Sequence, residues 1–135
     1  MYDNLYCKVF IDTDMDYDSL FELIKNCVAG RKHAISFIIT DWCDISVRRN
    51  KEYKQQQHLI DATDFLYWRY YLDIDPLNVD EKLYIRRVSK LLKDLSEHGM
   101  GVVIACEFEN EVNNMLGVNY CERLEEYRMA KELEK

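Results

Sequence analysis

The stretch from Phe65 to Pro76, FLYWRYYLDIDP, constrains the fold more than any other part of the chain. Aromatic and β-branched residues favour strands, and the chain's only proline ends the run. With a period of two, one side carries Leu66, Trp68, Tyr70, Leu72 and Ile74, and the other carries Phe65, Tyr67, Arg69, Tyr71, Asp73 and Asp75. The pattern predicts a central strand with one face in the core and one exposed face that is aromatic and charged.

The chain before this stretch predicts a strand, a helix and a long strand. Alternation of apolar residues favours a strand over Leu5–Asp12. Helical spacing favours a helix over 18–28, capped by the acidic turn before it and ended near Gly30. Alternation then predicts one long strand over 33–49 with a bend at Asp41.

The rest of the chain predicts a connection, two helices and a strand. Residues 49–64 lack periodicity and are interpreted as the mobile connection of a hairpin. A helix is expected over 80–98, a strand over 101–109 and an appended helix over 121–135, with a turn-rich connection over 110–120.

This order of elements predicts a single α+β domain over residues 1–135. Right-handed crossovers convert strand, helix, strand, strand, helix, strand into a ferredoxin-like split βαβ sandwich. Its first and third strands are central, and both main helices cover one face of the sheet. The other face is open unless the appended helix covers it.

The charge of the chain argues against nucleic acid as a ligand. Among 135 residues, 25 Asp and Glu outnumber 18 Lys and Arg, which gives a net charge of −7. Such a charge repels phosphate backbones and favours a basic partner. The basic residues Arg48, Arg49, Lys51 and Lys54 form a local cluster that is either a solvated loop or an anion-binding loop.

Cysteine usage and the N-terminus indicate a cytoplasmic protein. The five cysteines are odd in number and lack a Cys-x-x-Cys pair, and most lie within apolar runs, as expected of free thiols in a reducing compartment. The N-terminus lacks a basic start with a long apolar block, and no apolar run approaches the roughly 18 residues of a membrane span.

Two groups of acidic residues are candidate metal sites. Asp12, Asp14, Asp16 and Asp18 are spaced like the start of a calcium loop, but Tyr17 and Leu23 occupy the positions that need Gly and Glu. Helix capping explains this group better. The second group, Asp73, Asp75, Glu107 and Glu109, is either a carboxylate cluster able to hold a divalent metal or a solvated acidic rim.

Nucleophilic catalysis has little support in the sequence. None of His33, His58 and His98 stands near a serine or cysteine in a recognisable local signature. We therefore expect a protein without catalytic residues or cofactors.

The open face of the predicted sheet is the main candidate for function. Tyr, Trp and Arg often dominate protein interfaces, because they bury a large area and keep a polar end available for pairing. The predicted partner-binding residues are Trp42, Asp44, Tyr67, Arg69, Tyr71, Asp73 and Glu107. Two alternatives remain: the appended helix covers this face, or the face binds nucleic acid or a small ligand.

Two segments carry a family resemblance. YYLDIDP at Tyr70–Pro76 and ACEFEN at Ala105–Asn110, separated by the predicted helix, resemble segments of small bacterial proteins with an aromatic run, a Tyr-Leu-acid-Ile-acid-Pro motif and an Ala-Cys-acid-Phe-Glu-acid motif. Asn110 departs from the last acidic position. The chain thereby resembles, over Phe65–Val112, the immunity proteins of polymorphic and contact-dependent toxin systems.

This resemblance implies a small cytoplasmic protein that binds and blocks a cognate bacterial toxin, and it carries no catalytic residues. An acidic chain suits a basic, nucleic-acid-directed toxin, because opposite charges accelerate encounter. The alternatives are a metal-dependent enzyme using the carboxylate cluster and a non-catalytic module that forms a homodimer through the open face.

Overall fold

The computed structural model of the protein describes residues 2–53, 64–116, 129 and 133. Most of the predicted connection over 49–64 lies outside the described residues. The same holds for the predicted helix over 121–135, apart from Met129 and Leu133.

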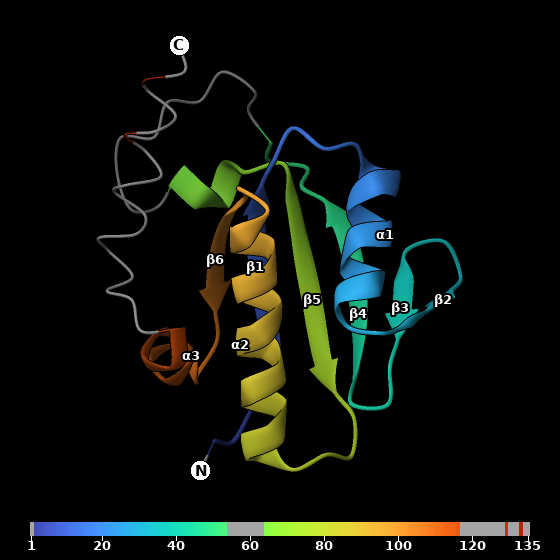
Figure 1. Ribbon diagram of the computed structural model, residues 1–135, viewed down its shortest axis with the longest axis vertical. Helices are drawn as coiled ribbons and strands as arrows, with labels where there is room; N and C mark the ends of the chain where they lie inside the picture. The colour runs from blue at the N-terminus through green and yellow to red at the C-terminus, as the bar shows by residue number, and fades with distance from the viewer. Residues whose placement is uncertain (1, 54–63, 117–128, 130–132, 134–135) are drawn as a thin grey trace.

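Six strands form one antiparallel sheet in the order β2-β3-β4-β5-β1-β6 (Figure 1). Their bounds are β1 Cys7–Asp12, β2 Arg31–His33, β3 Phe37–Ile39, β4 Cys43–Arg49, β5 Tyr70–Pro76 and β6 Gly101–Ala105. Strand β5 pairs with β1 on one side and with β4 on the other, so the predicted central strand is bordered on both edges. The predicted α+β class is confirmed.

Helices α1 (Tyr17–Cys27) and α2 (Glu81–Glu97) lie on the same face of the sheet (Figure 1). Both begin at a capping aspartate. Asp16 accepts a hydrogen bond from the backbone N–H of Ser19 at 2.8 Å, and Asp80 accepts one from Leu83 at 3.1 Å. The predicted capping role of the acidic turn is confirmed for Asp16.

A third helix, α3 (Glu109–Leu116), packs against α2 where a turn-rich connection was predicted. The prediction was wrong because it relied on the asparagines of this segment, which are poor helix formers. It gave too little importance to the apolar residues of the segment. Val112 is fully buried and belongs to the main core. Tertiary packing of one side thus outweighs weak helix propensity.

The main core lies between the sheet and the two long helices. Strand side chains of one phase point into it: Cys7, Val9, Ile11, Ile45, Val47, Tyr70, Leu72, Ile74 and Ile104. From α2 it receives Tyr84, Ile85, Val88, Leu91, Leu92 and Leu95. Each fully buried aliphatic side chain contributes about 1.5–3 kcal/mol to folding, so the face of the sheet toward the helices is strongly specified.

The predicted long strand over 33–49 is instead two strands, β3 and β4, and β2 precedes them; β2 and β3 extend the sheet at one edge. A turn at Ala34, which has a φ of 61°, separates β2 from β3. The second break is made by Thr40, whose hydroxyl accepts hydrogen bonds from the backbone N–H groups of Trp42 and Cys43 at 3.0 and 2.9 Å. Such local bonds compete with the ladder and close a tight turn at the predicted bend, Asp41.

The predicted strand at Phe65 begins only at Tyr70, because Asp64–Tyr67 form a 3₁₀ helix, η1. The side-chain amide of Asn50 donates hydrogen bonds to the carbonyls of Leu66 and Trp68 at 2.9 and 2.7 Å. Those carbonyls are therefore bound locally instead of in a ladder. As a consequence Leu66 is 43% exposed, and Trp68 packs on the sheet face opposite to Tyr70.

Candidate protein-binding face of the sheet

The sheet face turned away from α1 and α2 carries the candidate site, and we call it the outer face. Strand register places its residues: Phe10 pairs with Tyr71 and Val103, Lys8 with Asp73 and Ala105, and β4 contributes Asp44, Ser46 and Arg48 opposite Asp75, Asp73 and Tyr71. Because side chains alternate along a strand, these residues point away from the main core.

Asp73 is the centre of a polar network on the outer face. The phenol of Tyr6 donates a hydrogen bond to one carboxylate oxygen of Asp73, and Nε of Arg48 lies 3.8 Å from the other. Burial and this hydrogen bond raise the pKa of Tyr6, so its phenol stays protonated as a donor. Next to the network, Nζ of Lys8 lies 4.4 Å from the ring centroid of Tyr71, a cation–π contact.

Asp44 and Asp75 form a like-charge pair at one end of the outer face. They are Cα partners across β4 and β5. Among the described residues, neither has an ion-pair partner. Like charges directly opposite one another in a sheet lower stability, so this arrangement costs the isolated protein free energy.

We call this end of the outer face the acidic end, and define it as Asp44, Asp73, Asp75 and Glu107. Glu107 is exposed in the turn after β6, where its Oε2 accepts a hydrogen bond from the backbone N–H of Asn4 at 3.1 Å. Four carboxylates beside two cations, Arg48 and Lys8, leave this surface negatively charged, which favours a cationic partner.

The opposite end of the outer face is apolar. Phe10, Trp68 and Val103 form a second buried cluster, with Phe65 and Tyr71 packed against it. The rings of Phe10 and Phe65 are 5.2 Å apart in an edge-to-face arrangement. Residues of η1 and the following bend thus cover this end, and the acidic end lies at the far end of β5.

The predicted partner-binding residues do not all share this surface. Asp44, Tyr71 and Asp73 lie together on the outer face, as predicted. Trp42 does not: it is 4% exposed, faces the main core, and its ring lies 5.8 Å from that of Tyr84. The prediction for Trp42 was wrong because the turn at Thr40 breaks the alternation on which it relied.

The remaining three predicted residues lie outside the strands. Tyr67 belongs to η1, and Arg69 follows it in the bend, where it donates a hydrogen bond to the carbonyl of Asp14 at 3.4 Å. Asp75, the next-to-last residue of β5, is six residues after Arg69, so at about 3.3 Å per residue the two are about 20 Å apart along the chain. Glu107 joins the acidic end from its turn rather than from a strand.

Sequence reasoning overlooked Lys8 and Arg48 as members of this surface. The alternation of β1 and β4 places both on the outer face, which is the signal that could have found them. Grouping Arg48 and Arg49 in one basic cluster hid the place of Arg48 on the outer face, because the two residues lie on opposite sides of β4. Arg49, on the opposite side of β4, lies with Cζ 4.0 Å from the ring of Tyr17.

Within the described residues, the structure does not bring Asp73, Asp75, Glu107 and Glu109 together as a metal site. Within residues 2–53 and 64–116, no three His, Cys, Asp or Glu side chains are grouped so that they could hold one metal ion. Asp73 and Glu107 belong to opposite sides of β1, which separates β5 from β6. Burial raises the pKa of the Cys43 thiol to about 12 and that of Cys106 to about 11, so neither is an activated nucleophile.

Comparisons of the chain with protein-family models, with curated proteins and with solved structures give no match. In the part of the chain that the structure describes, no helix has the length and apolar character needed to cross a membrane.

Proposed function

We propose that this protein is an immunity-type inhibitor that binds a cognate, basic bacterial toxin in the cytoplasm through the acidic end of the outer face. Two sequence properties support the proposal: the resemblance of Phe65–Val112 to toxin immunity proteins and the net charge of −7. The outer face adds exposed and half-buried aromatic and charged side chains on the middle strands of the sheet.

We also propose that the fold is an extended ferredoxin-like sandwich. The four strands β6, β1, β5 and β4 lie side by side in that order, antiparallel, with α1 and α2 on one face. This order supports a split βαβ core to which β2 and β3 add an edge.

The single observation that carries the functional proposal is the Asp44–Asp75 pair. Two unpaired aspartates held opposite one another weaken the isolated fold, and a cation placed between them by a partner would convert that cost into affinity. A lysine or arginine of a basic toxin is a suitable cation. The neighbouring phenol of Tyr6 and the ring of Tyr71 offer contact area beside it.

The same observation argues against a homodimer through the acidic end. A two-fold interface sets the same patch against itself, so carboxylates would meet carboxylates. We therefore expect the purified protein to sediment as a monomer. A dimer that forms at low ionic strength would contradict this expectation.

The experiment that tests the proposed function is capture of the partner. The tagged protein, expressed with the product of the adjacent upstream gene, is purified at low and at high salt, and binding is then measured by calorimetry. We expect a complex with a basic toxin domain whose affinity falls as salt rises, together with loss of toxin activity in the complex. A tight complex that is indifferent to salt, or a toxin that stays active when bound, would contradict the proposal.

A further inference from the structure

A groove opens on the helix side of the sheet, away from the outer face. It has a volume of about 580 Å³ and lies between the end of α1, the turn before β4 and the middle of α2. Its lining includes Val28, Arg31, Asp41, Trp42, Arg87 and Lys90. Its size is within the usual range for small-molecule sites.

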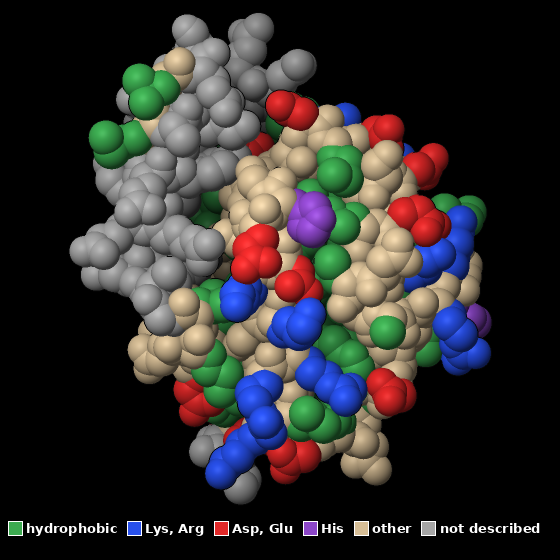
Figure 2. All heavy atoms as spheres, viewed as in Figure 1, with side chains coloured by type: hydrophobic (Ala, Val, Ile, Leu, Met, Phe, Trp, Pro, Cys, Tyr) green, Lys and Arg blue, Asp and Glu red, His purple; other side chains and the backbone are tan. Residues whose placement is uncertain are grey.

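The rim of the groove is basic although the chain is acidic. Three of its lining residues, Arg31, Arg87 and Lys90, are cations, and Asp41 is the one carboxylate in the lining. Nζ of Lys90 also lies 2.8 Å from Oδ2 of Asp94, just outside the lining. Figure 2 shows this side of the molecule, where Lys and Arg side chains gather in a column over α2, next to hydrophobic side chains. Within the described part of the chain, Arg31 has no ion-pair partner.

The inner wall of the groove is apolar and aromatic. Val28, Trp42 and Leu91 are buried residues of the main core, and they line the groove. Cζ of Arg87 lies 5.8 Å from the ring of Trp42, so this guanidinium sits between the apolar wall and the basic rim. An apolar wall with a few convergent charged groups is the usual composition of a ligand site.

We propose that this groove binds a phosphomonoester carried on a flat, largely apolar group. A phosphomonoester has a charge of about −1.5 to −2 at neutral pH. Within the described residues it would find Arg31 without an ion-pair partner, and Arg87 and Lys90 paired with Asp41 and Asp94, which it would have to replace. One guanidinium group can donate two parallel hydrogen bonds to two phosphate oxygens, and Arg31 and Arg87 supply two such groups. The apolar body of the ligand would lie against Trp42 and Leu91.

Asp41 allows a prediction whose sign is opposite to that for the cations of the rim. Its Oδ1 lies 3.4 Å from NH1 of Arg87, and its side chain is 88% exposed. A bound phosphate must therefore compete with Asp41 for Arg87, and with Asp94 for Lys90. Removing the charge of Asp41 should strengthen binding, whereas removing a rim cation should weaken it.

The test is calorimetric titration of the full chain at low ionic strength with phenyl phosphate. Two control probes are used: inorganic phosphate, which lacks the apolar group, and phenol, which lacks the phosphate charge. We expect saturable binding of phenyl phosphate that is tighter than that of either probe, with ¹H–¹⁵N shift changes confined to the groove.

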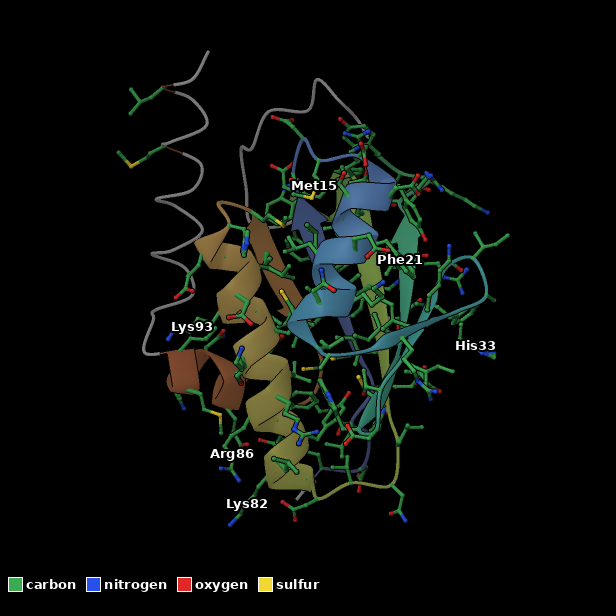
Figure 3. All side chains as sticks on the ribbon, turned by 45° about the vertical axis from the view of Figure 1, so that its right-hand side comes forward. Met15, Phe21, His33, Lys82, Arg86 and Lys93 are labelled. Carbon is green, nitrogen blue, oxygen red and sulfur yellow. The ribbon has the colours of Figure 1, made fainter. Side chains whose placement is uncertain are left out.

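Matched variants assign the binding to the groove. Arg31→Gln and Lys90→Gln should each weaken binding about fivefold, and Asp41→Asn should tighten it about threefold. Arg86→Gln is the control, because Arg86 is exposed on the same helix and points away from the sheet (Figure 3). Absence of saturable binding at millimolar phenyl phosphate, binding no tighter than that of inorganic phosphate, or equal affinity in the Arg31→Gln variant would overturn the proposal.

Because the groove and the acidic end lie on opposite sides of the sheet, failure of this proposal leaves the proposed function untouched. Likewise, failure of the proposed function leaves the groove proposal untouched. Shift changes on β4 and β5 around Asp44 and Asp75, rather than around Trp42, would show that the probe binds elsewhere and would also overturn the proposal.

Discussion

Ala29, at the end of α1, holds a left-handed backbone conformation with a φ of 52°. Its N–H donates to the carbonyl of Asn26 at 3.3 Å, and the N–H of Gly30 donates to Lys25 at 2.9 Å. This is the Schellman arrangement, in which glycine normally occupies the left-handed position. Here glycine is one residue later for a different reason: a Cβ on Gly30 would lie 2.5 Å from Cγ2 of the buried Ile38.

The two neighbouring substitutions should therefore have opposite effects on stability. Ala29→Gly relieves the left-handed strain and should raise the free energy of unfolding by about 0.5–1 kcal/mol. Gly30→Ala forces Ile38 to move and should lower it by about 1–3 kcal/mol. Urea denaturation of both variants measures the difference. A less stable Ala29→Gly variant would show that the cap is not strained.

Asp16 makes stability depend on pH at the start of α1. Hydrogen bonds from Ser19 lower the pKa of the Asp16 carboxyl in the folded state. The folded state therefore binds its proton less readily than the unfolded state, whose carboxyl has a pKa of about 3.9. The stabilisation is present above that value and is lost as the pH falls through the folded-state pKa.

The expected outcome is a stability gap between the native chain and Asp16→Ala that is largest near neutral pH and shrinks below about pH 4. Denaturation midpoints across this range provide the measurement. Asp18→Ala, a change in the first turn that leaves the cap in place, is the matched control. A gap that widens on acidification would contradict the assigned role.

Asp44→Asn should stabilise the isolated protein. Removing one charge from the Asp44–Asp75 pair relieves repulsion between directly opposed strands, and we expect a gain of about 0.5 kcal/mol at low salt. Thermal melting at low and high ionic strength checks this, since salt should reduce the gain. Equal or lower stability at low salt would show that the pair is not strained, and the observation behind the proposed function would be lost.

At the level of elements, the connection between β4 and β5 depends on Asn50. Besides its two amide contacts to the segment before β5, its backbone N–H donates to the carbonyl of Arg69 at 2.9 Å and its Oδ1 accepts from Glu52 at 3.0 Å. One side chain therefore holds both ends of the described connection. It also fixes where the aromatic stretch stops being a 3₁₀ turn and becomes a strand.

Asn50→Asp keeps the shape but removes the amide donors and places a carboxylate beside two carbonyls. We expect a loss of about 1–3 kcal/mol and faster hydrogen exchange at the N–H of Trp68, which donates to Phe65 within η1. Asn114→Asp, on the exposed side of α3, is the control. Unchanged exchange at Trp68 would refute the anchoring role of Asn50.

Elements set by local signals were predictable from the sequence. The helix expected over 80–98 is α2 with Asp80 as its cap and Gly99, at a φ of 81°, after its end. The segment around Trp68 was not predictable, because Asn50 acts on it from 16 to 18 residues away. The prediction that Tyr71 and Asp73 share the outer face was correct, since alternation along a strand depends only on neighbouring residues.

The candidate site was predictable to the same extent. Asp44, Tyr71 and Asp73 share one face because each belongs to an uninterrupted strand. The opposition of Asp44 and Asp75 depends on the register of β4 against β5, which the hydrophobic pattern alone leaves open. Trp42 was assigned to the wrong face of the sheet because the turn closed by the Thr40 hydroxyl interrupts the alternation of side chains between β3 and β4.

For the molecule as a whole, the two proposed surfaces should act independently. The acidic end belongs to β4, β5 and the turn after β6, and the groove belongs to the helix side. We expect Arg31→Gln to leave partner affinity unchanged and Asp44→Asn to leave phenyl phosphate affinity unchanged. A substitution that alters both would show that the two surfaces are coupled, contrary to this expectation.

The most direct test of the central claim is the affinity of the captured toxin domain for the double variant Asp44→Asn, Asp75→Asn at two salt concentrations. The double variant Asp18→Asn, Asp41→Asn, which removes two exposed aspartates of the helix side, is the charge-matched control. If the acidic end is the interface, the double variant binds at least about tenfold more weakly and with less salt dependence, while the control binds like the native chain. Native affinity in the double variant would contradict the claim.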